Sequence, residues 1–146
     1  MNKSQKVISA GSEDRENLLI QLKETQSKFG YLPREVMADL ADSFGLSIGD
    51  VYGVATFYSF LSAEPLGRNV IRVCKSLPCH LKNSLIESVE QEIGINPGET
   101  TTDGRFSFQL TNCIGACDKA PAMMINHDIH GSLTPGEISR ILKAYK

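Results

Sequence analysis

The sequence predicts an α+β protein, with an N-terminal helical bundle in residues 1–66 and an α/β domain in residues 67–146. Three observations support this prediction. Apolar residues recur at helical spacing over roughly the first sixty residues, a β-branched run begins at Val70, and aromatic and polar residues alternate after Phe106. A proline-containing stretch at 63–67 separates the two patterns and indicates a linker.

Two helices are expected between Ser12 and Gly45. Ser12 suits the N-cap of the first helix because its hydroxyl can accept a backbone N–H, and Gly30 ends that helix. Pro33 suits the first position of the second helix, which ends near Gly45. The residues of these two helices that are expected to face the core are Leu18, Leu22, Phe29, Val36, Met37, Leu40 and Ala41.

A third helix is expected to open at Ser47, because Asp50 three residues later completes a capping-box pattern. The aromatic stretch at 56–61 is interpreted as core, since aromatic residues at helical spacing are usually buried; a surface that docks a partner is the alternative. The residues of this helix that are expected to face inward are Val51, Tyr52, Val54, Ala55 and Tyr58.

Strands and helices alternate after the linker. The last helix has the clearest start, because Thr134, Pro135 and Glu137 supply a cap, a first-turn proline and a capping-box acid. The elements expected before it are a strand over 69–74, a helix over 83–93, strands over 106–110 and 122–125, a turn, and a short strand near Ile129.

Composition excludes several classes of partner. The 146 residues are 41% hydrophobic and 22% charged, as in an ordinary globular protein, and the net charge of −2 provides no basic field to attract nucleic acid. No apolar run is long enough for a signal peptide or a membrane span, so no direct membrane insertion is expected. The expected location is the cytoplasm, either free or peripheral to a membrane complex, where cysteines serve as metal ligands or redox groups rather than disulfides.

All four cysteines fall into two pairs, Cys74-x4-Cys79 and Cys113-x3-Cys117, with 33 residues between the pairs. Each pair lies where a loop is expected after a strand, so the two loops could bring four thiolates to one end of a sheet. Four soft, anionic thiolates complete a [2Fe-2S] centre, with two on each iron. Structural zinc accepts the same ligands and is the main alternative; disulfides and free thiols are the others.

Side chains offer such a cluster little charge compensation, because the region from Gly67 onward holds nine Lys and Arg against eight Asp and Glu. Backbone N–H groups near Ser76, Leu77, Ile114 and Gly115 are better candidates, and Gly115 either approaches a sulfur closely or is a simple turn glycine.

None of the histidines is expected to bind metal. His80 follows a cysteine but is not needed as a ligand, since four cysteines fill the coordination. His127 and His130 are expected to be solvated.

Three segments resemble the family of the 24-kDa subunit of NADH:quinone oxidoreductase. They are GYLPREVMADLADSFGLSIGDVYGVATFYSFL, VIRVCKSLPCHLKNS and TDGRFSFQLTNCIGACDKAPAMMIN, so the resemblance runs from about Gly30 to the end of the chain. This family also includes the small subunits of NAD-linked and electron-bifurcating hydrogenases and of NAD-dependent formate dehydrogenases.

The resemblance implies a thioredoxin-like domain after the helical bundle, with Cys74, Cys79, Cys113 and Cys117 as ligands of one [2Fe-2S] cluster. It implies a hetero-oligomeric complex with further iron–sulfur subunits and a flavoprotein subunit that holds FMN and the NAD(H) site. The sequence agrees, since it lacks G-x-G-x-x-G and G-x-x-x-x-G-K-[ST]. A resemblance to the cis-proline segment of thioredoxins implies a cis bond before Pro121.

The expected function is therefore one-electron exchange with the partner's FMN in an NAD(H)-linked oxidoreductase, as an enzyme subunit with no substrate site of its own. A respiratory NADH dehydrogenase, a hydrogenase or a formate dehydrogenase could own such a subunit. Two other functions stay open: a zinc-stabilised interaction module without redox activity, and a free-standing shuttle ferredoxin, which the helical bundle disfavours.

Overall fold

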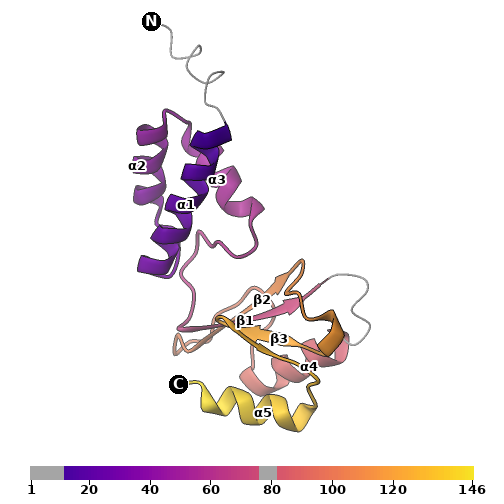
Figure 1. Cartoon of the computed structure of the whole chain (residues 1–146). Coiled ribbons are helices and arrows are strands. Elements are labelled where there is room, and N and C mark those ends of the chain that lie inside the picture. The colour runs from indigo at the N-terminus through magenta and orange to yellow at the C-terminus, as the bar shows by residue number, and fades with distance from the viewer. Residues whose placement is uncertain (1–11, 76–81) are drawn as a thin grey trace, which may run out of the picture. The chain divides into compact units, whose positions relative to one another are not determined.

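The computed structural model of the protein describes residues 12–75 and 82–146. The chain divides into two compact units, Met1–Pro65 and Leu66–Lys146, and each is described by itself below. The first unit is helical and the second combines a sheet with helices, so the fold is α+β as predicted (Figure 1).

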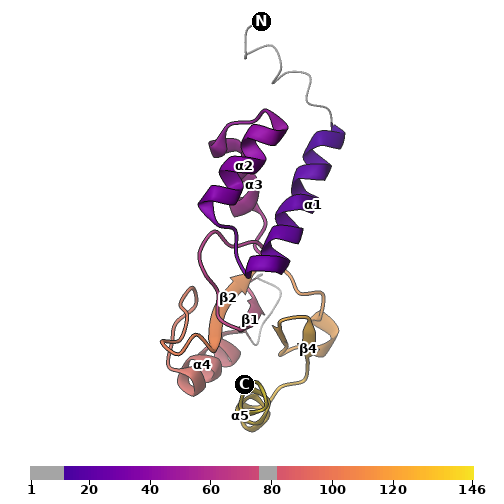
Figure 2. The same cartoon turned by 90° about the vertical axis from the view of Figure 1, so that its left-hand side faces the viewer.

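The helical unit consists of α1 (Ser12–Phe29), α2 (Arg34–Phe44) and α3 (Ile48–Phe57), and these three helices pack against one another (Figure 2). Two of the expected helix starts are shifted by one residue: α1 begins at Ser12 itself, and Pro33 is the N-cap of α2 rather than its first residue. Other helix ends follow the expected local chemistry. Gly45 ends α2 in the left-handed conformation, with φ of 64°, which glycine adopts without steric cost. Ser47 and Asp50 form the predicted capping box at the start of α3.

The core of the helical unit is aliphatic. On α3 the buried positions are one helical turn apart, so this stripe faces α1 and α2. Val36 and Leu40 of α2, predicted to be core, are only half-buried. The buried residues of this core are Leu18, Leu22, Leu32, Met37, Ala41, Val51 and Ala55.

Most aromatic residues of the helical unit lie outside that core, contrary to the prediction, although Phe44 packs half-buried against it. Phe29, Tyr52 and Tyr58 were expected to be buried but are exposed. Phe57 is 75% exposed, and Phe60 is exposed as well. The reason is geometric: Tyr52 lies one residue from the inward stripe of α3, about 100° around the helix, whereas Phe57 and its successors lie at or beyond the helix end. The interpretation of residues 56–61 as core was therefore wrong for the aromatic residues, whereas Leu61 packs half-buried against the core.

The second unit is a four-stranded mixed sheet in the order β2-β1-β3-β4. The parallel pair β1 and β2 is joined through α4, as a parallel connection requires, and β3 and β4 follow antiparallel. The bounds are β1 Asn69–Cys74, α4 Lys82–Ile93, β2 Phe106–Thr111, the 3-10 helix η3 Cys117–Lys119, β3 Met123–Ile125, β4 Asp128–His130 and α5 Pro135–Ala144.

Helices α4 and α5 pack together on one face of this sheet (Figure 1). Ile71 and Val73 of β1 point to the helices, as do Phe106 and Phe108 of β2, and all four are buried in one core with residues of α4 and α5. Because side chains alternate along a strand, Arg72 and Cys74 lie on the opposite face. The sheet therefore has a helix-covered face and a face that carries the first cysteine.

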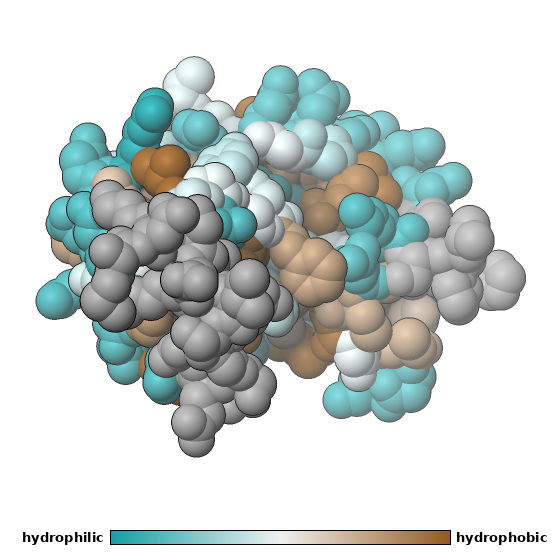
Figure 3. Space-filling model, turned by 90° about the horizontal axis from the view of Figure 1, so that it is seen from above, coloured by the Kyte–Doolittle hydropathy of each residue, from teal (hydrophilic) through white to brown (hydrophobic). Residues whose placement is uncertain are grey.

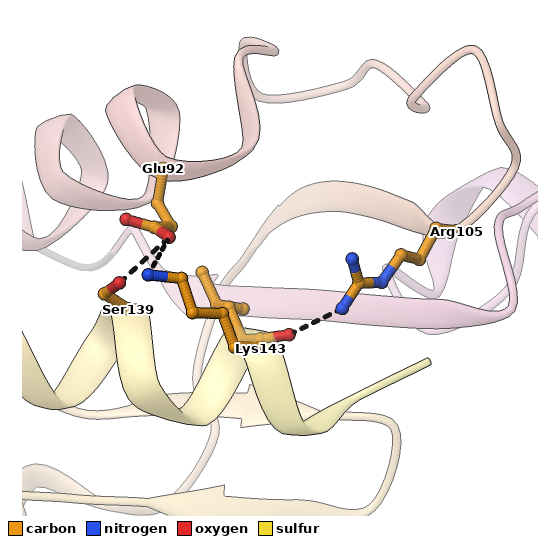
Figure 4. Close-up of polar contacts among 5 residues, drawn as sticks. Glu92, Arg105, Ser139 and Lys143 are labelled. Carbon is orange, nitrogen blue, oxygen red and sulfur yellow. Dashed lines mark hydrogen bonds and ion pairs between the residues drawn. The ribbon is translucent and has the colours of Figure 1, made fainter.

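Polar contacts hold α5 to the rest of this unit (Figure 4). Arg105, just before β2, donates to the main-chain oxygen of Leu142 at 3.1 Å, close to the helix end where carbonyls lack partners. On α4, Glu92 accepts from the Ser139 hydroxyl at 2.9 Å and pairs with Lys143 at 3.7 Å. The predicted capping box of Thr134 and Glu137 at the start of α5 is present. The hydrogen bonds that Glu137 accepts from Thr134 lower the pKa of its carboxylate.

Two sequence expectations on histidines have different outcomes. His127 is exposed, as expected, but His130 is half-buried and its ring bonds the Tyr145 hydroxyl at 3.1 Å, so the prediction that it is solvated was wrong. That hydroxyl also donates to Asp128 at 3.0 Å. Desolvation and this acceptor raise the pKa of Tyr145.

The bond between Ala120 and Pro121 is cis, which confirms the expectation. Among the described residues, no helix is both long and apolar enough to cross a membrane.

Candidate functional site

The topology brings the cysteines of both sequence pairs to one edge of the sheet. Strands β1 and β2 are parallel, so their C-terminal ends reach the same edge, where Cys74 lies directly opposite Thr111. The segment after β2 then carries Cys113 and Cys117 past that edge. Cys79 lies outside the described residues, as do Ser76, Leu77 and His80.

Three of the four cysteines line a single pocket at this edge. Cys74 is buried at 7% exposure, whereas Cys113 and Cys117 are exposed, so the pocket opens to solvent beside the second pair. Its other walls are short or apolar, which leaves space between the sulfurs. These walls are formed by Ile114, Gly115, Ala116, Ala120 and Ala122.

The loop between the second pair of cysteines is anchored at alternate residues. Ile114 and Ala116 are buried together with Cys74, while Gly115 between them is exposed. Gly115 has a φ of 71°, and its N–H donates to the Cys113 sulfur at 3.2 Å. A Cβ at this position would meet nothing within 4 Å, so backbone conformation rather than space favours glycine. The close approach to a sulfur considered from the sequence is present.

Cys74, the buried cysteine, is held by main-chain groups at the ends of β1 and β2. The Cys74 thiol donates to the main-chain oxygen of Asn112 at 3.1 Å, and the Lys75 N–H continues the ladder by donating to the Thr111 oxygen at 2.7 Å. The side chain of Thr111 is fully buried. Within residues 12–75 and 82–146, its hydroxyl has no hydrogen-bond partner.

This donor set fits an iron–sulfur cluster. Such a cluster needs soft thiolate ligands and donors that compensate its negative charge. The pocket provides three cysteine sulfurs and a backbone N–H already directed at Cys113. Thr111, the strand partner of Cys74, carries a buried hydroxyl without a hydrogen-bond partner in the described part of the chain. Across the described ranges, no three His, Cys, Asp or Glu side chains form a group that could hold a single metal ion.

Sequence reasoning did not identify Thr111 as the strand partner of Cys74. The signal was available in the alternation of β2: Phe106, Phe108 and Leu110 share the helix-covered face, so Thr111 must lie on the other face, with Cys74. What the sequence did not contain is the strand register that makes these two residues neighbours.

Comparisons with known proteins agree with the site. Residues 4–146 match the family described as thioredoxin-like [2Fe-2S] ferredoxin. The chain is 44% identical over 127 residues to a subunit of the NADH-quinone oxidoreductase of Escherichia coli K12, covering 86% of this chain and 76% of the relative. It is 37% identical over 131 residues to the HndA subunit of the NADP-reducing hydrogenase of Solidesulfovibrio fructosivorans, covering 88% and 77%.

A solved structure is also similar. The air-oxidized NAD+-reducing [NiFe]-hydrogenase contains a chain that superposes with a TM-score of 0.74 at 28% identity. The match covers 88% of this chain and 22% of the hydrogenase chain, so this protein spans about a fifth of that chain's length.

Proposed function

Because the chain belongs to the thioredoxin-like [2Fe-2S] ferredoxin family, we propose that Cys74, Cys79, Cys113 and Cys117 hold one [2Fe-2S] cluster. The observation that carries this proposal is the pocket at the end of β1 and β2, which three of these cysteines line. The function that follows is transfer of single electrons within an NAD(H)-linked oxidoreductase complex.

The residues of the pocket have distinct tasks in this function. When bound, the cluster supplies a one-electron redox couple. The cysteines bind it as thiolates, and the buried Ile114 and Ala116 fix the loop that presents the second pair. The Gly115 N–H offsets negative charge at Cys113. Because Cys113 and Cys117 are exposed, this side of the pocket is where a redox partner can approach.

The partner we propose is a flavoprotein subunit that holds FMN and the NAD(H) site, within a larger assembly that has further iron–sulfur subunits. One relative is named as a subunit of an NADH-quinone oxidoreductase and the other as a subunit of an NADP-reducing hydrogenase, which supports a hetero-oligomeric complex. The sequence carries neither nucleotide-binding motif considered above, so the nicotinamide chemistry is assigned to the partner. The cytoplasmic location stays a prediction.

The helical unit offers a contact surface for such a partner. Hydrophobic residues reach the surface among hydrophilic ones in the view of Figure 3. On α3 and the turn after it, exposed apolar side chains follow closely in sequence, and the rings of Phe57 and Tyr58 meet edge to face at 5.1 Å. Exposed aromatic clusters are typical of protein–protein contacts. We define this aromatic surface by Ile48, Tyr52, Phe57, Tyr58 and Phe60.

Electron exchange with a flavoprotein is tested by anaerobic mixing. The chain is loaded with its cluster, reduced with dithionite, freed of excess reductant, and mixed in a stopped-flow instrument with the oxidised flavoprotein subunit. We expect cluster absorbance to recover as flavin absorbance bleaches, much faster than with the same concentration of free FMN. Cys79→Ala, carried through the same procedure, should deliver no electrons. Equal rates with the flavoprotein and with free FMN would contradict a dedicated partner.

A further inference from the structure

The buried hydroxyl of Thr111 needs an explanation. The side chain is 0% exposed, and within the described part of the chain its oxygen has no hydrogen-bond partner. Most buried polar groups in native proteins are paired, because burial without a partner costs free energy. Ser107, on the same face of β2, follows that rule: its hydroxyl bonds the Thr100 hydroxyl at 2.6 Å and the Gly67 N–H at 2.7 Å.

The strand register places this hydroxyl beside a cysteine. Thr111 and Cys74 are direct partners at the end of the parallel pair, and adjacent strands lie about 4.8 Å apart. Paired residues on neighbouring strands project to the same face. That face is opposite to the one where Phe108 packs under the helices, and Cys74 on it lines the pocket.

Cluster binding changes what the Cys74 sulfur requires from its neighbours. As a thiol, Cys74 donates its proton to the Asn112 oxygen at 3.1 Å. As a ligand it must be a thiolate, so the proton leaves and the sulfur becomes an acceptor only. A buried thiolate facing a carbonyl oxygen is electrostatically unfavourable unless a donor lies nearby. Thr111, the neighbour in register, carries an unused donor.

We propose that the Thr111 hydroxyl donates to the Cys74 thiolate of the cluster-loaded protein and thereby raises the cluster's reduction potential. This proposal rests on the proposed function. Reduction adds one electron and no proton, taking the cluster and its four thiolates from a charge of about −2 to about −3. The hydroxyl keeps its proton, and its bond to sulfur strengthens as the negative charge grows, which favours the reduced state.

The test compares Thr111→Val with Thr111→Ser in the full chain carrying its cluster. Valine keeps the shape of threonine and removes the hydroxyl, whereas serine keeps the hydroxyl. The readouts are iron and sulfide per chain and the midpoint potential from an EPR-monitored redox titration. We expect Thr111→Val to retain iron and to have a lower midpoint potential, with the reduced-to-oxidised ratio at fixed potential falling up to about tenfold, which is 59 mV for one electron. Thr111→Ser should titrate close to the unmodified chain.

Ser107→Ala is the matched control. It removes a buried hydroxyl from the same face of the same strand, four residues from the pocket edge, and should leave the potential unchanged. An unchanged potential in an iron-replete Thr111→Val protein would overturn the inference, as would an equal shift in Ser107→Ala. Loss of iron in Thr111→Val but not in Thr111→Ser would also overturn it, by assigning the hydroxyl to cluster retention. Absence of a cluster from the unmodified chain would instead refute the proposed function.

Discussion

The two units of the protein bury their aromatic residues to different extents. In the second unit, Phe108 is 0% exposed and packs between the sheet and its helices. In the helical unit, Phe57 is 75% exposed and Tyr52 is 51% exposed, while leucine, methionine, valine and alanine form the buried core and Phe44 packs half-buried against it. The second unit buries aromatic rings within its core, whereas the helical unit leaves most of its aromatic area at the surface.

This difference indicates a division of tasks between the units. Strands β1 and β2 end beside each other, so the packing that stabilises the second unit also builds the cysteine pocket. The helical unit completes its core without its aromatic surface, which leaves that area available to a partner. We therefore expect cofactor loading and partner binding to respond to different substitutions.

The largest effect is expected from removing a proposed ligand. Cys79→Ala should lower iron and sulfide to background and disturb the fold around the pocket, because a cluster's binding energy contributes to folding. The helical unit should keep its helix signal in circular dichroism, since its core contains no cysteine. The checks are metal analysis and the visible spectrum after anaerobic purification. A variant that retains full iron would remove Cys79 from the ligand set.

The next largest effect is on stability, and it differs between one aromatic residue of each unit. Phe108→Ala creates a cavity in a closed core and should cost about 3–5 kcal/mol, whereas Phe57→Ala should change stability by no more than about 0.5 kcal/mol. Thermal midpoints measured at one fixed scan rate on cluster-loaded protein compare the two variants directly. Similar losses in both would show that the helical unit depends on its exposed aromatic residues.

A smaller effect is expected on partner affinity. The double variant Tyr52→Ser, Phe57→Ser should weaken binding to the flavoprotein subunit about tenfold or more, which corresponds to about 1.4 kcal/mol, while iron content stays unchanged. Calorimetric titration measures the affinity. Phe29→Ser removes an exposed aromatic ring from α1 instead and serves as the matched control. An equal loss in the control would argue against a surface confined to α3 and its following turn.

The smallest of these effects is expected from removing a helix capping box, a feature that both units contain. Ser47→Ala and Thr134→Ala each remove a capping box, one from α3 and one from α5. Each should cost about 1 kcal/mol, which for domains of this size lowers the thermal midpoint by about 4–8 °C. The iron content of both variants should stay at its original level. A loss of cluster in Ser47→Ala would show that the helical unit takes part in cofactor retention.

Local signals were predictable and long-range ones were not. The capping boxes at Ser47 and Thr134 and the glycine stop at Gly45 depend on a few neighbouring residues, and the structure confirms them. The outward direction of Tyr52 and the half-buried ring of His130 depend on which elements pack nearby, so helical spacing and turn composition led to wrong predictions there.

The candidate site divides in the same way. The sequence itself shows that the cysteines fall into two closely spaced pairs and that Gly115 lies within the second pair. The resemblance to a known family supplies the cluster type. The exposure of Cys113, the burial of Cys74 and the position of Thr111 come from strand register and loop packing, which no spacing encodes.

Whether the four cysteines hold a [2Fe-2S] cluster is decided by iron, zinc and sulfide analysis of the anaerobically purified chain, with an EPR spectrum after dithionite reduction. We predict about two irons and two sulfides per chain and an S = 1/2 signal, as expected for a [2Fe-2S] centre. One zinc per chain with no sulfide and no signal, in protein purified from iron-replete cells, would contradict the cluster and leave a structural module.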